Sequence, residues 1–184
     1  MRVIGLGGAL ALLATGAAAG PWFQHEYGEM RSYHGDWMAV CANAGEGACR
    51  IVATAKDPGS SAFFDLRLAA HRIDGSPYWA IEVMDRNMPA STLTSLTFNF
   101  DGDKVSIPVG AWVQGDFDGY NAVDTVVIRD GDLATGLVDR MIAGRRVIVT
   151  YEPHGEGDGR AEFSLRGVAS ASNAVQAIVL PRQE

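Results

Sequence analysis

Two apolar runs, Trp37-Met38-Ala39-Val40-Cys41 and Cys49-Arg50-Ile51-Val52-Ala53-Thr54, are separated only by the loop Ala42 to Ala48. The loop contains two glycines, and two apolar runs joined by a short glycine-containing loop are typical of a β-hairpin. Facing positions of antiparallel strands bring Cβ atoms to a separation that a disulfide can span. The sequence therefore predicts an antiparallel hairpin closed by a disulfide between Cys41 and Cys49.

These two cysteines are the only ones in the chain, and a redox pair and a metal site are the alternatives to a structural disulfide. A thioredoxin-like redox site needs C-x-x-C at a helix start, and a structural zinc site needs four ligands. The spacing here is C-x7-C, and the nearest histidine in sequence is His34. A redox pair and a metal site remain as alternatives, but we interpret the pair as structural and expect no metal and no cofactor.

The first 19 residues have the pattern of a secretory signal peptide. Arg2 supplies a positive start, residues 3–14 are uncharged and apolar, and Ala17 and Ala19 are the small residues that signal peptidase requires. We expect cleavage near Ala19, leaving residues 20–184 as a single β-rich domain in the periplasm or associated with the outer membrane. The alternative is a membrane anchor, but the apolar run is shorter than the ~20 residues of a bilayer span, and we expect no later transmembrane segment.

Charge excludes one class of partner. The 184 residues carry a formal net charge of −7, so the long-range field repels phosphate backbones, and we expect no nucleic-acid partner. No fixed-period repeat and no proline- or serine-rich linker divides the chain, which favours one domain.

Alternating apolar and polar residues predict further strands along the chain, and turn residues separate them. The turn Asp101 to Asp103 predicts a hairpin between residues 98–100 and 105–107. The aromatic segment from Trp22 to Tyr33 is expected to dock on the sheet as a terminal strand, with an exposed aromatic arm as the alternative. The other predicted strands are 63–68, 78–84, 93–100, 146–151 and 160–166.

Two helices are expected in the C-terminal half. Residues 133–142 place Leu133, Leu137 and Met141 on one helical face, with Asp130 or Asp132 able to cap the start and Gly144 placed to end it. A second short helix is expected at about 168–178, before Pro181. The predicted fold class is therefore mainly β, an antiparallel β-sandwich-like single domain with one or two short helices in the C-terminal half.

No catalytic pattern is evident, so we expect the protein not to be an enzyme. The carboxylate-rich loop around Asp116 and Asp118 lacks the later ligands of an EF-hand, and we interpret it as a surface loop, with a weak cation site as the alternative. His71 and His154 are expected to be solvated. A hydrolase that uses Asp116, Asp118 and His154 is the least favoured hypothesis.

Two motifs resemble a known family. The run Gly35-Asp36-Trp37 leading into Cys41, and the run Phe163-Ser164-Leu165-Arg166-Gly167 near the end, are similar to the opening and closing segments of the invasion-associated locus B family. The resemblance implies a β-rich, sandwich-like fold in the periplasm or at the outer membrane and, in pathogens, association with entry into host cells. It brings no catalytic residues. Many members carry a second cysteine pair before the helix, whereas residues 124–132 here contain none, which favours a divergent branch.

These features lead to two functional expectations. The first is a non-enzymatic exported envelope protein that acts through protein or surface contacts with an envelope or host partner, including host-cell association. The second is a periplasmic small-ligand-binding or inhibitor module, with a groove lined by Trp79, Trp112 or Tyr120.

Overall fold

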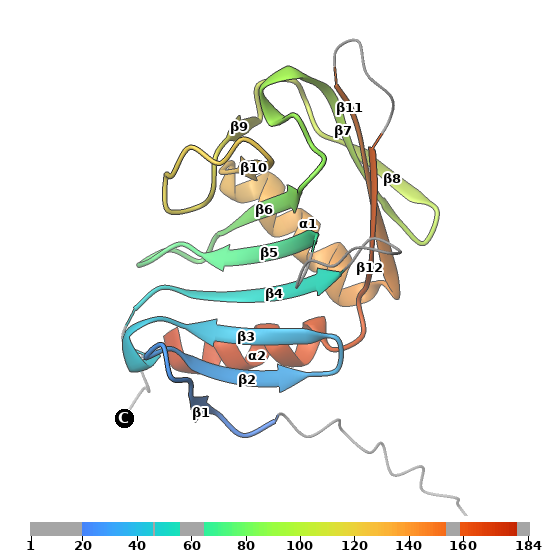
Figure 1. The fold of residues 1–184 in the computed structure, drawn as a ribbon. Helices are drawn as coiled ribbons and strands as arrows, with labels where there is room; N and C mark the ends of the chain where they lie inside the picture. The colour runs from blue at the N-terminus through green and yellow to red at the C-terminus, as the bar shows by residue number, and fades with distance from the viewer. Residues whose placement is uncertain (1–19, 46, 56–64, 154–158, 180–184) are drawn as a thin grey trace, which may run out of the picture.

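Two antiparallel sheets and two α-helices make up the fold in the part of the chain that the structure describes (Figure 1). The structure is a computed structural model that describes residues 20–45, 47–55, 65–153 and 159–179. The predicted fold class, mainly β with two helices in the C-terminal half, is confirmed. The expected signal peptide and His154 lie outside the described residues.

The larger sheet has eight strands in the order β1-β2-β3-β4-β5-β6-β10-β9. Its first six strands follow one another as antiparallel neighbours, so most of the sheet is a simple meander. The strands are β1 (Phe23–Gln24), β2 (Met30–His34), β3 (Trp37–Cys41), β4 (Cys49–Ala55), β5 (Leu66–Arg72), β6 (Trp79–Asp85), β9 (Trp112–Gln114) and β10 (Thr125–Ile128).

The smaller sheet has four strands in the order β12-β11-β7-β8. They are β7 (Leu93–Phe100), β8 (Asp103–Ser106), β11 (Arg146–Pro153) and β12 (Gly159–Ser164). The hairpin predicted at 98–107 is formed by β7 and β8, with Phe100 opposite Asp103. Asp101 and Gly102 both have positive φ, 52° and 110°, which is the backbone that a two-residue hairpin turn requires.

Helix α1 (Gly131–Ala143) and helix α2 (Val168–Val179) lie behind the large sheet in the view of Figure 1. Of the two candidate caps for α1, Asp130 is the one that caps it, because its side chain accepts a hydrogen bond from Leu133 N at 3.0 Å. Gly144 follows the last turn, as expected. Two short 3-10 turns, Asn43–Gly45 and Ala90–Thr92, complete the elements.

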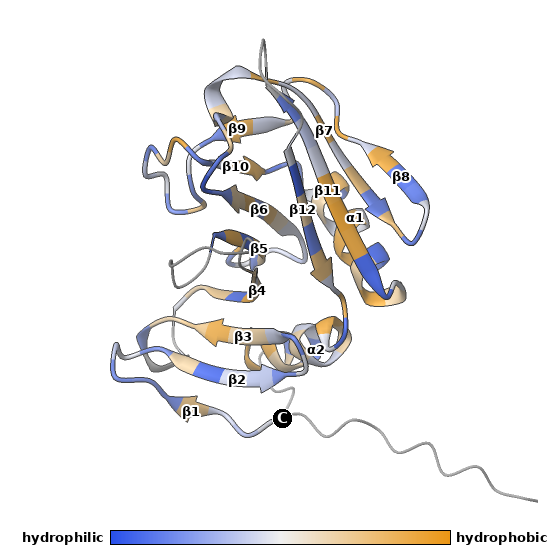
Figure 2. Ribbon diagram, turned by 45° about the vertical axis from the view of Figure 1, so that its right-hand side comes forward, coloured by the Kyte–Doolittle hydropathy of each residue, from blue (hydrophilic) through white to orange (hydrophobic). Residues whose placement is uncertain are grey.

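One continuous hydrophobic core joins the inner face of the large sheet to the small sheet and both helices. Helix α2 packs on β2, β3 and β4, and helix α1 packs on β6. In Figure 2, β11 has hydrophilic residues at its start and hydrophobic residues after them, and of these Val147 and Val149 are fully buried in this core. A separate small apolar cluster, Val40, Val52 and Ala69 with Met38 packed against it, lies on the outer face of the large sheet.

The structure differs from the sequence predictions in three strands, one of which is the short strand β9, which was not predicted. The strand predicted at 63–68 lies partly outside the described residues, and β5 runs on to Arg72. Strand β10 was not predicted, because its four residues are all buried between β6 and β9 and show no alternation. The N-terminal segment forms β1 and β2 at the sheet edge, as the docked-strand prediction requires.

Within the described parts of the chain, no helix is both long enough and apolar enough to cross a bilayer.

The predicted disulfide is confirmed. Cys41 and Cys49 face each other in the register of β3 and β4, with a Cα–Cα distance of 4.1 Å, and they are bonded. The sulfur atoms are buried in the main core, at the end of the hairpin where the loop leaves the sheet.

The double substitution Cys41→Ala with Cys49→Ala is expected to lower the free energy of unfolding by about 2–3 kcal/mol, because a short covalent loop no longer restricts the unfolded chain. Urea denaturation of the two proteins measures this difference. As a control, dithiothreitol should shift the wild-type curve by a similar amount and leave the variant unchanged. An unfolding midpoint of the wild type that reductant does not move would contradict the prediction.

Candidate functional site

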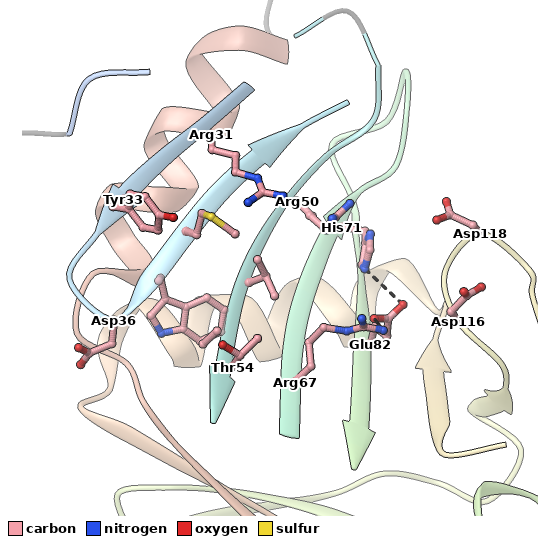
Figure 3. A pocket seen from close by; sticks show the side chains of 14 residues that line it. Arg31, Tyr33, Asp36, Arg50, Thr54, Arg67, His71, Glu82, Asp116 and Asp118 are labelled. Carbon is pink, nitrogen blue, oxygen red and sulfur yellow. Dashed lines mark ion pairs between the residues drawn. The ribbon is translucent and has the colours of Figure 1, made fainter. Parts of the chain in front are cut away.

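A pocket of about 470 Å³ opens on the outer face of the large sheet (Figure 3). Strands β2 to β6 supply its floor, and the loop 115–124 between β9 and β10 forms one wall. Its lining residues are Arg31, Tyr33, Asp36, Trp37, Met38, Arg50, Val52, Ala53, Thr54, Arg67, His71, Glu82, Asp116 and Asp118.

Strand register explains why these side chains meet. Successive residues of a strand point to opposite faces, so directly paired residues on neighbouring strands share a face. Tyr33 pairs with Met38, Met38 with Val52, and Val52 with Ala69, which in turn pairs with Glu82. One row across the outer face thus runs from an aromatic rim over an apolar floor to a buried carboxylate.

The adjacent row carries basic groups. Val40 lies between Arg31 and Arg50 in the register, and Arg50 pairs with His71 on the next strand. Arg31 donates two hydrogen bonds to Glu29 Oε2, at 2.8 and 2.5 Å, and Arg50 reaches Glu29 Oε1 at 3.5 Å. The Glu29 carboxylate therefore accepts hydrogen bonds from two guanidinium groups at this side of the pocket.

Glu82 is the most strongly perturbed acid of the pocket. Its carboxylate is buried, lies 2.7 Å from Arg67 Nη2 and 3.6 Å from His71 Nε2, and accepts a hydrogen bond from the Phe117 amide at 2.9 Å. Burial alone would raise its pKa, but the interactions with His71, Arg67 and the Phe117 amide outweigh it and lower the pKa of Glu82 to about 2. The group is therefore ionised at neutral pH.

The expectation that His71 is solvated is wrong. His71 is only 6% exposed, and its ring stacks on Phe117 with 4.2 Å between the centroids. Arg129 holds Phe117 in place, because it donates to the Phe117 carbonyl at 2.7 Å and lies over the ring. Loop 115–124, which is distant in sequence, covers this histidine, so the local sequence around His71 carries no sign of its burial.

Asp116 and Asp118 lie on the far side of the pocket from Arg31 and Arg50 (Figure 3). Asp116 is occupied within its own turn, where its Oδ1 accepts from Tyr120 N at 2.8 Å. Among the described residues no group of three or more His, Cys, Asp or Glu side chains is arranged to hold a metal ion. The structure does not describe His154, so it does not test the full set of the hydrolase hypothesis.

The expected groove of Trp79, Trp112 and Tyr120 is not the pocket that the structure shows, since none of the three lines it. Trp79 is buried in the main core, with the Arg72 guanidinium 5.0 Å from its ring centroid. Tyr120 lies in loop 115–124, and its side chain is exposed to solvent. Asp116, Asp118 and His71 were considered one by one in the sequence, but the pocket that brings them together was missed because single strands reveal alternation but not register.

The two segments singled out in the sequence, Gly35 to Cys41 and Phe163 to Gly167, meet in space although about 130 residues separate Asp36 from Arg166. Trp37 is buried, and its indole Nε1 donates to the Ser164 carbonyl at 2.8 Å. Asp36 N donates to the Arg166 carbonyl at 2.9 Å. The Arg166 guanidinium also donates to both oxygens of Asp36, at 2.6 and 3.2 Å, and this hydrogen bonding holds the pKa of Asp36 below its usual range.

Glycine is required at this contact on both sides. Gly35 and Gly167 have φ of +61° and +105°. A Cβ on Gly35 would lie 2.6 Å from the Arg166 carbonyl oxygen, and one on Gly167 would lie 1.7 Å from the His34 carbonyl oxygen. Phe163 and Leu165 add buried side chains to the core beside it. These motif residues thus join the β2–β3 turn to the segment between β12 and α2, and only Asp36 and Trp37 also line the pocket.

Comparison with known proteins agrees with this fold. The sequence matches no protein-family model and no curated protein. The arrangement of two antiparallel sheets with two helices belongs to a class of β-rich folds that is already represented among solved structures. One such structure is the crystal structure of invasion associated protein B from Bartonella henselae, with a TM-score of 0.56 over 80% of this chain and 96% of that chain. The sequence identity is 14%, so the likeness is one of fold.

Acidification should weaken the folded state through Glu82. Its folded-state pKa of about 2 lies below the ordinary glutamate value of 4.5, so its contribution of about 3 kcal/mol is present above pH 4.5 and is lost as the pH falls toward 2. Urea unfolding between pH 6 and pH 2.5 should show a shallower pH dependence for Glu82→Gln than for the wild type. Glu152→Gln, at an exposed position on β11, is the control and should retain the wild-type slope.

Gly167→Ala should destabilise the protein by ~3 kcal/mol, because the added methyl group meets the His34 carbonyl and the positive φ is strained for alanine. The matched control is Gly136→Ala in α1, where an added Cβ has open space around it and alanine favours the helix by ~1 kcal/mol. Thermal denaturation should therefore show a lower Tm than the wild type for Gly167→Ala only. Equal Tm values for both variants would show that the contact is not tight in solution.

Proposed function

We propose that this chain is an exported, non-enzymatic binding protein of the bacterial envelope, and that the outer-face pocket is its binding surface. The pattern of residues 1–19 and the disulfide support export, since disulfides persist in oxidising compartments. The fold likeness to invasion associated protein B supports the same assignment.

The observation that carries this proposal is the chemistry of the pocket lining. No serine, cysteine or lysine is among the described lining residues, and no described acid or histidine of the pocket is hydrogen-bonded to Thr54 to activate it as a nucleophile. Its buried acid, Glu82, is held ionised by Arg67, His71 and a backbone amide, so it is unsuited to donate a proton at neutral pH. The pocket instead combines a small apolar floor, formed by Met38 and Val52, with charged groups fixed on rigid strands, and such a concave surface can bind and orient a small ligand.

A second candidate function is contact with a protein of the envelope or of a host cell. Phe23 and Tyr33 favour it, because they stack at the β1–β2 edge with 5.7 Å between ring centroids and are 39% and 60% exposed. Exposed aromatic groups are enriched at protein interfaces. The name of invasion associated protein B makes host-cell association the form of contact to examine.

The first experiment follows the protein in the bacterium that produces it. Mature protein beginning near Gly20, with the disulfide formed, should be recovered from the periplasmic or outer-membrane fraction. Uncleaved protein with free thiols in the cytoplasmic fraction would overturn the proposed export.

A second experiment examines the pocket of the purified native protein. Native mass spectrometry should detect a small molecule retained by the wild type and lost in Thr54→Trp, because Thr54 is exposed on β4 and a larger side chain there fills the pocket. Thr94→Trp, at an exposed position on β7, is the matched control and should retain the molecule. Retention by Thr54→Trp as well would place binding elsewhere.

A further inference from the structure

We propose that the pocket takes a small amphiphile with a single anionic group, a carboxylate or phosphate, whose anion binds between Arg31 and Arg50 and whose apolar part lies on Met38 and Val52. This inference rests on the proposed binding function and names the chemical class of its ligand. Four features of the described residues support it.

The first feature is an excess of hydrogen-bond donors. Two guanidinium groups share the single carboxylate of Glu29, and Arg50 reaches it only at 3.5 Å, through Glu29 Oε1. Each guanidinium offers five N–H donors in a planar fork that fits carboxylate and phosphate oxygens. An incoming anion would supply the acceptors that Glu29 does not provide.

The second feature is the accessibility of these groups. The Arg31 and Arg50 side chains are 19% and 33% exposed, so they are already partly desolvated and held on β2 and β4. A charge-assisted hydrogen bond is stronger in such a setting than on an open surface. Rigid strands also reduce the entropy lost when the anion binds.

The third feature is the apolar floor beside them. Met38 and Val52 line the pocket directly and pack with Val40 and Ala69 in a cluster separate from the main core. The Tyr33 ring adds an aromatic rim. A volume of about 470 Å³ suits a small organic molecule rather than a bare ion.

The fourth feature limits the ligand to one anionic group. Asp116 and Asp118 lie across the pocket from the two arginines, so a second anionic group at that side would be repelled (Figure 3). Glu82 offers no free charge to a cationic ligand, because Arg67 and His71 already contact it. The formal net charge of −7 further disfavours polyanions and anionic bilayers.

The test uses three soluble probes of equal chain length, octanoate, 1-octanol and octylammonium, in isothermal titration calorimetry with the disulfide-bonded protein. Octanoate should bind at least tenfold more tightly than 1-octanol, and octylammonium should bind more weakly than either. Arg50→Gln should weaken octanoate binding at least tenfold and leave 1-octanol binding unchanged. Arg160→Gln on β12, which removes the same charge at an exposed site outside the pocket, should bind octanoate as the wild type does.

Several results would overturn the inference. Equal affinity for octanoate and 1-octanol would show a purely apolar pocket, and octanoate binding unaffected by Arg50→Gln would place the anion elsewhere. Arg50-dependent sedimentation with phosphatidylglycerol vesicles would indicate a bilayer surface instead of a soluble ligand. If no probe binds while native mass spectrometry still finds a molecule retained by the wild type and lost in Thr54→Trp, the ligand class is wrong and the proposed binding function stands.

Discussion

The close contact between the β2–β3 turn and the segment after β12 is the constraint on which the rest of the structure depends. Gly35 and Gly167 let two backbones approach to distances that no side chain permits, and the Trp37 indole bonds to the Ser164 carbonyl across the same contact. The large sheet, the end of the small sheet and the start of α2 meet there. Because Trp37 and Asp36 also line the pocket, the position of its near wall follows from this packing.

The pocket exists because the two faces of the large sheet are covered differently. Both helices pack in the core on the inner face, where Trp37, Ala39 and Ile51 are fully buried. The outer face keeps a small apolar cluster surrounded by charged residues, and loop 115–124 raises a wall at one side by seating Phe117 on His71. A sheet with one polar face is ordinary for antiparallel strands; the wall makes this face concave.

Local chemistry was enough to predict much of the fold. The disulfide hairpin, the β7–β8 hairpin and helix α1 with its Asp130 cap each depend on residues close in sequence. Strand β10 was missed because burial on both faces removes alternation, and the burial of His71 was missed because its cover comes from residue 117. The pocket needs the register of five strands, which no single segment encodes. The segments around Trp37 and Leu165 were singled out in the sequence for a resemblance, but their contact with each other was not predictable from their separate sequences.

The separation of the two motifs along the chain also sets an order of events during folding. Synthesis proceeds from the N-terminus, so Trp37 must wait for Ser164, 127 residues later, before its hydrogen bond can form. Contacts between such distant segments form late and slowly, because the chain between them must lose conformational entropy before the contact can stabilise the fold. The β2–β3 turn therefore stays without its final partner until almost all of the polypeptide has been made. Truncation shortly before β12 would leave every earlier strand present and the Trp37 contact unmade.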